Sequence, residues 1–185
     1  PGYFANLAVL DDLPGLRANM VFYRGRLVAR EGKPLFSPPQ PQDGGVTNTV
    51  HVRPFPIEAL RLTASGESLP VIEIVPGQIL TRKKWAKVKI EDGAVVPDTE
   101  RDILKLVVVE RHKATGNIGR GLVSGFGLKK GALASSIAHD SHNLIAVGTS
   151  DADIFTALKE IERVQGGLAV AAEGNVLASL SLPIA

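Results

Sequence analysis

The 185-residue sequence contains no cysteine. This absence excludes a disulfide scaffold, a thiolate zinc site and a thiol nucleophile together, and with them the Cys-x-x-Cys zinc site of the cytidine deaminases. The sequence also lacks an apolar run near the ~20 residues that cross a bilayer. A basic segment followed by an apolar one, which is typical of a signal peptide, is absent as well. We therefore expect no membrane partner and a cytoplasmic location.

Charge of one sign is also scarce, since the formal net charge is only +2. One basic cluster contains Arg82, Lys83, Lys84, Lys87 and Lys89. Ala86, Val88 and Ile90 alternate with the last two lysines, which is the pattern of a half-buried strand with a solvated face. Trp85 is the only aromatic residue in the cluster, so no stacking platform is indicated. We expect no nucleic-acid partner.

The hydrophobic content of 44% and charged content of 22% are ordinary for a soluble globular protein. The clearest linker is Pro34 to Gly45, with the sequence PLFSPPQPQDGG. Proline removes backbone donors and fixes φ, so this segment favours neither a helix nor a central strand. We predict an N-terminal region at residues 1–33, a linker at residues 34–45 and an α/β domain at residues 46–185.

Runs of β-type residues dominate both regions. They occur at residues 7–10, 21–23, 26–28, 46–52, 60–63, 71–75, 79–90, 103–110, 132–138, 144–147, 168–172 and 176–180. The first three runs cannot bury a core alone and need further strands as partners. The last two form a predicted hairpin with a turn at Gly174-Asn175. The predicted fold class is mixed α+β, mainly β-sheet with few helices.

One amphipathic helix is predicted at residues 151–165. Its apolar face contains Ile154, Ala157, Leu158, Ile161 and Val164. Ser150 or Asp151 can cap its N-terminus, and Gly166 is predicted to be the C′ residue that ends it.

Four polar residues, His139, Asp140, His142 and Asn143, lie within five positions between the apolar runs 132–134 and 144–147. On a helix the two histidines would share a face and could chelate a metal, whereas on a strand they would point to opposite faces. Asp140 and Asn143 could instead satisfy backbone donors in a structural turn. A third alternative is a functional loop that faces a neighbouring active site.

The other candidate groups favour structural roles. His51 and His112 are each isolated, which indicates partly buried histidines without a special role. Gly119, Gly121, Gly125, Gly127 and Gly131 fit neither a P-loop nor a dinucleotide fingerprint, and indicate a loop that moves or a place where backbones approach closely. Ser124, Ser135 and Ser136 lack the Gly-x-Ser-x-Gly elbow of a nucleophilic serine.

Residues 119–153, with the sequence GRGLVSGFGLKKGALASSIAHDSHNLIAVGTSDAD, resemble the C-terminal region of the bacterial adenine deaminases in the amidohydrolase superfamily. The resemblance extends to Gly166-Gly167-Leu168 and to the ending Leu182-Pro183-Ile184-Ala185. Residues 1–13 are similar to the segment by which amidohydrolase chains leave the catalytic barrel to complete a small β-sandwich. Asn6 stands where the family usually has aspartate.

The resemblance implies hydrolysis of adenine to hypoxanthine and ammonia. In that family a hydroxide on a divalent metal (manganese, iron or zinc) attacks C6 of the purine while a carboxylate shuttles protons. The ligands include a His-x-His pair at the ends of barrel strands, and this sequence has neither that pair nor a barrel-length βα repeat. No metal ligand is carried over to this chain, and His139, Asp140, His142 and Asn143 match the C-terminal motif of the family.

We therefore expect the C-terminal part of an adenine deaminase, inactive alone, that acts as a lid or scaffold beside a barrel elsewhere in its own polypeptide. Residues 1–33 would end a β-sandwich that sequence outside the chain completes. The metal would sit in the barrel, adenine would be the substrate of the complete enzyme, and we expect a homo-oligomer. The alternative is a stand-alone, non-catalytic binding or regulatory module.

Overall fold

A computed structural model describes residues 2–37, 39 and 45–184. The chain divides into two compact units, Pro1–Gln42 and Asp43–Ala185, and each is described here by itself. Among the described residues, β-strand is the predominant regular structure and there is one α-helix, so the predicted α+β, mainly β fold class is confirmed. Half of the predicted linker, residues 38 and 40–44, lies outside the described residues.

The first unit is a four-stranded antiparallel sheet with the order β1-β2-β3-β4. Its strands are β1 (Leu7–Leu10), β2 (Ala18–Tyr23), β3 (Arg26–Arg30) and β4 (Lys33–Pro34), so Pro34 ends an edge strand. The predicted hairpin turns at Arg24 and Gly25, which both have positive φ. The Asn6 side-chain oxygen accepts a 2.9 Å hydrogen bond from the Arg24 backbone N–H. Because either an amide or a carboxylate oxygen can accept this bond, asparagine can replace the usual aspartate here.

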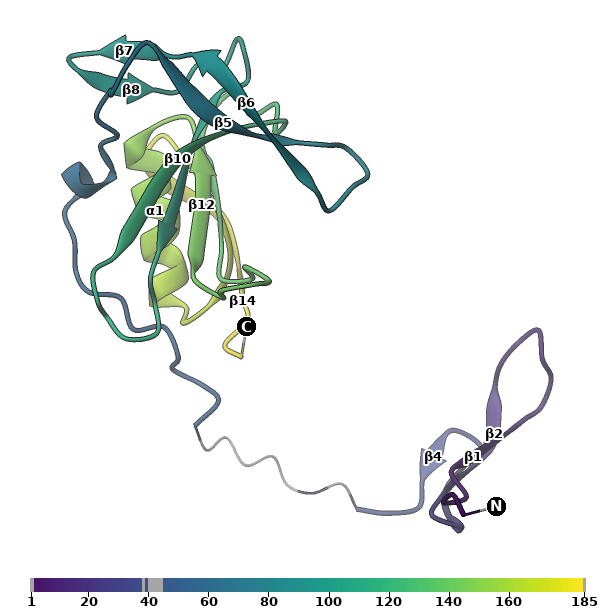
Figure 1. Cartoon of the computed structure of the whole chain (residues 1–185). Helices are drawn as coiled ribbons and strands as arrows, with labels where there is room; N and C mark the ends of the chain where they lie inside the picture. Colours follow the sequence, from purple (N-terminus) through teal and green to yellow (C-terminus); the bar gives the residue numbers. More distant parts are fainter. Residues whose placement is uncertain (1, 38, 40–44, 185) are drawn as a thin grey trace. The chain divides into compact units, whose positions relative to one another are not determined.

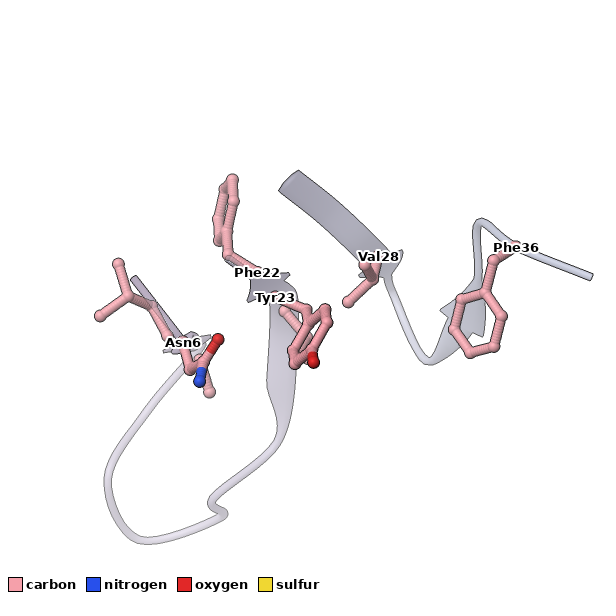
Figure 2. Close-up of a pocket in the computed structure, with 8 residues that line it drawn as sticks. Asn6, Phe22, Tyr23, Val28 and Phe36 are labelled. Carbon is pink, nitrogen blue, oxygen red and sulfur yellow. The ribbon is translucent and has the colours of Figure 1, made fainter. Parts of the chain in front are cut away.

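This first sheet has no core of its own. None of residues 2–37 and 39 is buried. Figure 2 shows Tyr23 of β2 and Val28 of β3, which line one open hollow together with Asn6, just before β1, and Phe36. The sheet therefore presents apolar side chains that nothing within the described part of this unit covers.

The second unit is built on an eight-stranded sheet with the order β14-β13-β11-β12-β9-β10-β5-β6. All neighbours are antiparallel except β10 and β5, which are parallel. Its elements are the 3-10 helix η1 (Ile57–Leu60), β5 (Ser68–Ile74), β6 (Thr81–Lys87), β7 (Lys89–Glu91), β8 (Ala94–Val96), β9 (Leu104–Val109), β10 (Ile118–Ser124), β11 (Ala132–Ser135), β12 (Leu144–Gly148), α1 (Asp151–Arg163), β13 (Gly167–Ala172) and β14 (Asn175–Ser181). Figure 1 shows α1 running alongside the strands, with the β7–β8 hairpin near one end of the sheet.

The core lies between α1 and the sheet. Ile154 and Ile161 are 0% exposed and Leu158 is 2% exposed, so the predicted apolar face of the helix is confirmed. The Ser150 side chain accepts a hydrogen bond from the Asp153 N–H, so of the two predicted cap residues Ser150 is the N-cap and Asp151 is the first helical residue. The apolar residues of α1 pack against Val107, Ala134, Ala146 and Ala169 of four neighbouring strands.

The predicted end of the helix is wrong by one residue. Gln165, with φ of 59°, is the left-handed residue, and its N–H donates to the Glu162 carbonyl while the Gly166 N–H donates to the Ile161 carbonyl. This is a Schellman motif with Gln165 at C′. A side chain is useful there, because Gln165 Oε1 accepts a 3.3 Å hydrogen bond from the Val50 N–H.

Two predicted strands are absent from the described residues. Residues 46–52 run beside the core without strand pairing, held by Gln165 and by a 2.7 Å hydrogen bond from the His51 N–H to the Arg111 carbonyl. Residues 60–63 follow η1 and form only an isolated bridge from Thr63 to Ala94. The apolar content of these segments led to the wrong prediction. Val50 and Leu60 are buried, but the backbone around them does not pair as a strand.

Two further expectations need correction. The predicted strand at residues 79–90 is divided, because Lys87 pairs with Ser68, the first residue of β5, and β7 then pairs with β8. The closing hairpin turns at Glu173 and Gly174, which both have positive φ, rather than at Gly174-Asn175.

The predicted glycine-rich loop is partly a strand. Gly119 and Gly121 lie within β10. Gly125 donates its N–H to an Asp102 carboxylate oxygen at 2.7 Å, and Gly127 donates to the other oxygen at 2.9 Å. At Gly131 a Cβ would lie 2.5 Å from the Ala171 carbonyl oxygen. The close approach of the Ala171 backbone therefore explains why residue 131 is a glycine.

Candidate functional site

The turn that carries His139, Asp140, His142 and Asn143 connects β11 to β12. The two strands pair antiparallel from Ala132↔Gly148 to Ser135↔Ile145, which leaves residues 136–143 as the connection. Both strands lie inside the eight-stranded sheet, between β13 and β9. The apolar runs that flank the polar cluster are therefore central strands, and they hold the turn at one end of the sheet.

The first end of the turn is fixed by Ser136, which is 0% exposed. Its N–H donates to the Gly167 carbonyl at 2.9 Å, and its hydroxyl accepts from the Gly167 N–H at 2.8 Å. Ser135 adds a 2.8 Å hydrogen bond from the Ile137 N–H to its hydroxyl. These contacts give both serines a structural role.

The second end is fixed by Arg111, which is 4% exposed. Its guanidinium donates to the His142 carbonyl, and its backbone N–H donates to the Asn143 side-chain oxygen at 3.4 Å. Burial lowers the pKa of Arg111. His142 has φ of 51°, and its N–H donates to the Ala138 carbonyl. Residues 142 and 143 thus close the turn. The Asn143 side chain accepts from a backbone donor, as expected if this segment is a structural turn.

The tip of the turn is different in character. The side chains of His139 and Asp140 are completely exposed, and His139 Nδ1 lies 3.2 Å from Asp140 Oδ1. The Asp140 carboxylate contacts the imidazole rather than closing the turn. A paired imidazole and carboxylate that project into solvent can donate to and accept from a ligand at the same time.

The cluster does not form a metal site. Across residues 2–37, 39 and 45–184, no group of three or more His, Asp or Glu side chains is placed to hold a metal ion. His139 projects at the tip, whereas the backbone of His142 closes the base of the turn. These residues therefore offer no donor set that fits the metal implied by the resemblance.

His112 also belongs to the site, although its isolated position in the sequence did not indicate this. Its Nε2 lies 2.9 Å from the Ser141 carbonyl oxygen. The pairing Leu144↔Val109 between β12 and β9 explains this contact, since it brings the residues after β9 beside those before β12. Knowledge of that strand pairing would have predicted the contact.

Glu110 holds the segment that carries His112. Its carboxylate accepts hydrogen bonds from the backbone N–H groups of His112, Lys113 and Thr115, at 2.5, 2.8 and 2.9 Å. These bonds, with that of Thr115 the strongest influence, lower the pKa of Glu110 to about 2. These bonds hold the segment next to the turn. The remaining histidine, His51, has an exposed side chain, and its backbone N–H donates to the Arg111 carbonyl at 2.7 Å.

Comparison with known proteins shows the family of the chain. The family described as "Adenine deaminase C-terminal domain" matches residues 78–185, which include β6, the turn and α1. The chain belongs to this family. The adenine deaminase of Dehalococcoides mccartyi (strain ATCC BAA-2266 / KCTC 15142 / 195) is 53% identical over 185 residues. "Adenine deaminase 2" of Carboxydothermus hydrogenoformans is 48% identical over the same length, and the adenine deaminase of Halalkalibacterium halodurans is 44% identical over 188 residues.

All of the chain is covered in these comparisons, but it spans only 32% of the length of each of the three relatives. The residues before the family match are covered as well, so the first unit also has counterparts in the relatives. Within the described ranges, no helix has the length and apolar character needed to cross a membrane.

Proposed function

We propose that the chain is the C-terminal part of an adenine deaminase that hydrolyses adenine to hypoxanthine and ammonia. Identity of 53% across the whole chain to a relative named adenine deaminase carries this proposal. The chain has the role of a lid or scaffold beside a catalytic barrel in the rest of the polypeptide. The stand-alone alternative is disfavoured, because each of these relatives continues well beyond the matched region.

In this proposal the divalent metal, manganese, iron or zinc, belongs to the barrel, where it supplies the hydroxide that attacks adenine. The first unit completes a small β-sandwich with strands outside the chain. The complete enzyme is a cytoplasmic homo-oligomer. The contribution of this chain is then to place polar groups, and not metal ligands, near the substrate.

The turn between β11 and β12 is the proposed point of contact with adenine. Adenine presents ring-nitrogen acceptors and an exocyclic amine donor. The exposed Asp140 carboxylate can accept from the amine, and the His139 imidazole can donate to a ring nitrogen. Ser136 and Arg111 hold the two ends of the turn, so the tip is presented from a rigid base.

The test is adenine turnover by the complete enzyme with His139→Ala or Asp140→Ala. We expect kcat/KM to fall by about tenfold or more, on the order of 1.4 kcal/mol, with little change in thermal stability. The matched control is His51→Ala, which removes an exposed imidazole but keeps the backbone N–H that donates to the Arg111 carbonyl, and it should retain normal turnover. Full activity in both turn variants, or loss only in proportion to lost folded protein, would leave the turn with a structural role alone.

A further inference from the structure

The face of the sheet opposite α1 carries two rows of side chains in register across the strands. The first row contains Leu106, Val147, Leu133, Val170 and Ala178, and the second contains Val108, Ile145, Ser135, Leu168 and Leu180. We call these two rows the open face. Ser135 is its only polar side chain, and none of its members is charged.

The described residues cover the open face only in part. Val147 is 4% exposed and packs with Leu104 and Val123, but the β13 and β14 members are open. Leu168, Val170 and Leu180 are 40%, 36% and 54% exposed. An apolar hollow of about 340 Å³ lies over the face, with Phe126 at its border. Antiparallel sheets usually alternate apolar and polar side chains when one face meets water. On β9, β11, β12 and β13 the residues between the open-face positions are buried beneath α1, so these four strands are apolar on both faces.

Two glycines extend the rows onto β10, where Gly121 pairs with Leu106 and Gly119 pairs with Val108. Neither has the positive φ that favours glycine. A Cβ at Gly121 would meet nothing within 4 Å, and one at Gly119 would make only an ordinary 3.8 Å contact with Val108. Glycine inside a strand weakens it, and it marks places where another backbone or a ligand approaches closely. No described residue fills that position.

We infer that the open face is the docking surface for a segment of the same polypeptide outside these 185 residues, and that this docking fixes the position of the turn at His139–Asn143. The inference rests on the proposed function, because it requires a longer polypeptide. About two thirds of the length of each matched relative lies outside the region that the chain covers. The occupant is therefore a covalently attached segment, whose effective concentration at the face is high.

The chemistry of the face indicates the kind of occupant. A surface without charge resembles a permanent interface, such as a domain core cut in half, rather than a transient one. The bare backbone at Gly119 and Gly121 suits an apolar helix or strand with a large side chain over the glycines. Ser135 ends β11 within the second row, so the occupant would lie next to the first residue of the β11–β12 connection.

Side-chain oxidation by hydroxyl radicals, read by mass spectrometry, tests the inference. The 185-residue chain and the complete polypeptide are labelled at equal concentration. We expect Leu168, Leu180 and Phe126 to be oxidised at least about fivefold less in the complete polypeptide, as core positions of an interface are. Leu177 is the matched control, because it is 63% exposed on the same strand as Leu180 but lies outside both rows.

Equal oxidation of the open face in the two proteins overturns the inference. Protection that disappears on hundredfold dilution also overturns it, because the occupant would then be a second copy. Gly121→Val adds a separate test: the space around Gly121 is open, so the isolated chain should keep its thermal midpoint, while the complete polypeptide loses protection at Leu168. Gly121→Ala should have a smaller effect of the same kind. If His139 and Asp140 variants are fully active, the adenine contact fails, but the oxidation result stands unaffected.

Discussion

The two units of the chain both form a β-sheet, but within the described residues only the sheet of the second unit is covered by a helix. The first has four paired strands and tight turns, yet none of its described residues is buried. In the second unit, α1 covers one face of the sheet, and Ile154, Leu144 and Val107 are buried at 1% exposure or less. Local sequence is thus enough to specify strands and turns, whereas burial requires a second layer.

This difference predicts unequal stability within one chain. Turn residues with positive φ and a hydrogen bond from Arg24 to Asn6 specify the first sheet locally. A sheet of a few strands without a packed face is nevertheless marginal in water. The second unit gains its stability from apolar burial, at about 25 cal/mol per Å² of surface removed from water.

The largest expected effect is in amide hydrogen exchange of the 185-residue chain. We expect amides of β12 to exchange at least about a thousandfold more slowly than those of β2, because exchange from a core strand requires global opening. Measurement is by mass spectrometry or NMR on a proven monomer. Equally slow exchange across β1 and β12 would show that the first sheet is stable without a partner layer.

The next effect compares one apolar truncation in each unit. Leu158→Ala, at a side chain that is 2% exposed, should lower the free energy of unfolding by ~2–5 kcal/mol through lost burial and a cavity. Leu7→Ala, at a side chain that is 58% exposed, should change it by less than about 0.5 kcal/mol. Denaturant titration of both variants gives the two values. A large effect at Leu7 would mean that the first unit buries this residue in the chain.

A smaller effect concerns the start of α1. Ser150→Ala removes the acceptor for the Asp153 N–H and should cost about 1 kcal/mol. Ser150→Thr keeps a hydroxyl and should retain most of the stability, which separates the cap from side-chain packing. Thermal unfolding of the three proteins provides the comparison. An unchanged midpoint for the alanine variant would show that the helix is held by packing alone.

The fold was predictable from the sequence where the spacing of apolar residues matches the set of side chains that are buried. The apolar face of α1 and its cap at Ser150 are both visible in the sequence, because a helix buries one face at a fixed spacing. Strand β10 was not predicted, since Gly119 and Gly121 occupy alternate positions where apolar residues would reveal a strand. Residues 46–52 were wrongly predicted as a strand, because their backbone is held by Gln165 and Arg111 rather than by a neighbouring strand.

Part of the candidate site was also predictable from the local pattern of apolar and polar residues. Polar residues between two apolar runs indicate a turn, and the structure places His139 and Asp140 at its exposed tip. The roles of Arg111 and His112 depend on the pairing of β9 with β12, which is a contact between segments about 35 residues apart that no local pattern encodes. Sequence therefore located the turn but not its supports.

The smallest effect concerns two carboxylates, Asp11 in the first unit and Glu110 in the second. The Asn19 side-chain amide, and after it Arg17, lower the pKa of Asp11, whereas backbone N–H groups, chiefly that of Thr115, lower the pKa of Glu110 to about 2. Both pKa values are depressed in the folded state. Their stabilising contributions are therefore complete above the ordinary carboxylate range and are lost as pH falls, for Glu110 between about 4.5 and about 2.

Carbon-13 NMR titration of the two carboxyl groups in low and high salt distinguishes the causes. Salt should raise the pKa of Asp11 toward its ordinary value, because part of its shift comes from the charge of Arg17. The pKa of Glu110 should change little, since hydrogen bonds from neutral backbone groups are not screened in the same way. Thr115→Val is the matched variant for Glu110, because it removes one side-chain donor and leaves the backbone donors in place. A strong salt dependence at Glu110 would show that its support beside the turn is ionic, and the rigid backbone cradle proposed for His112 would then be wrong.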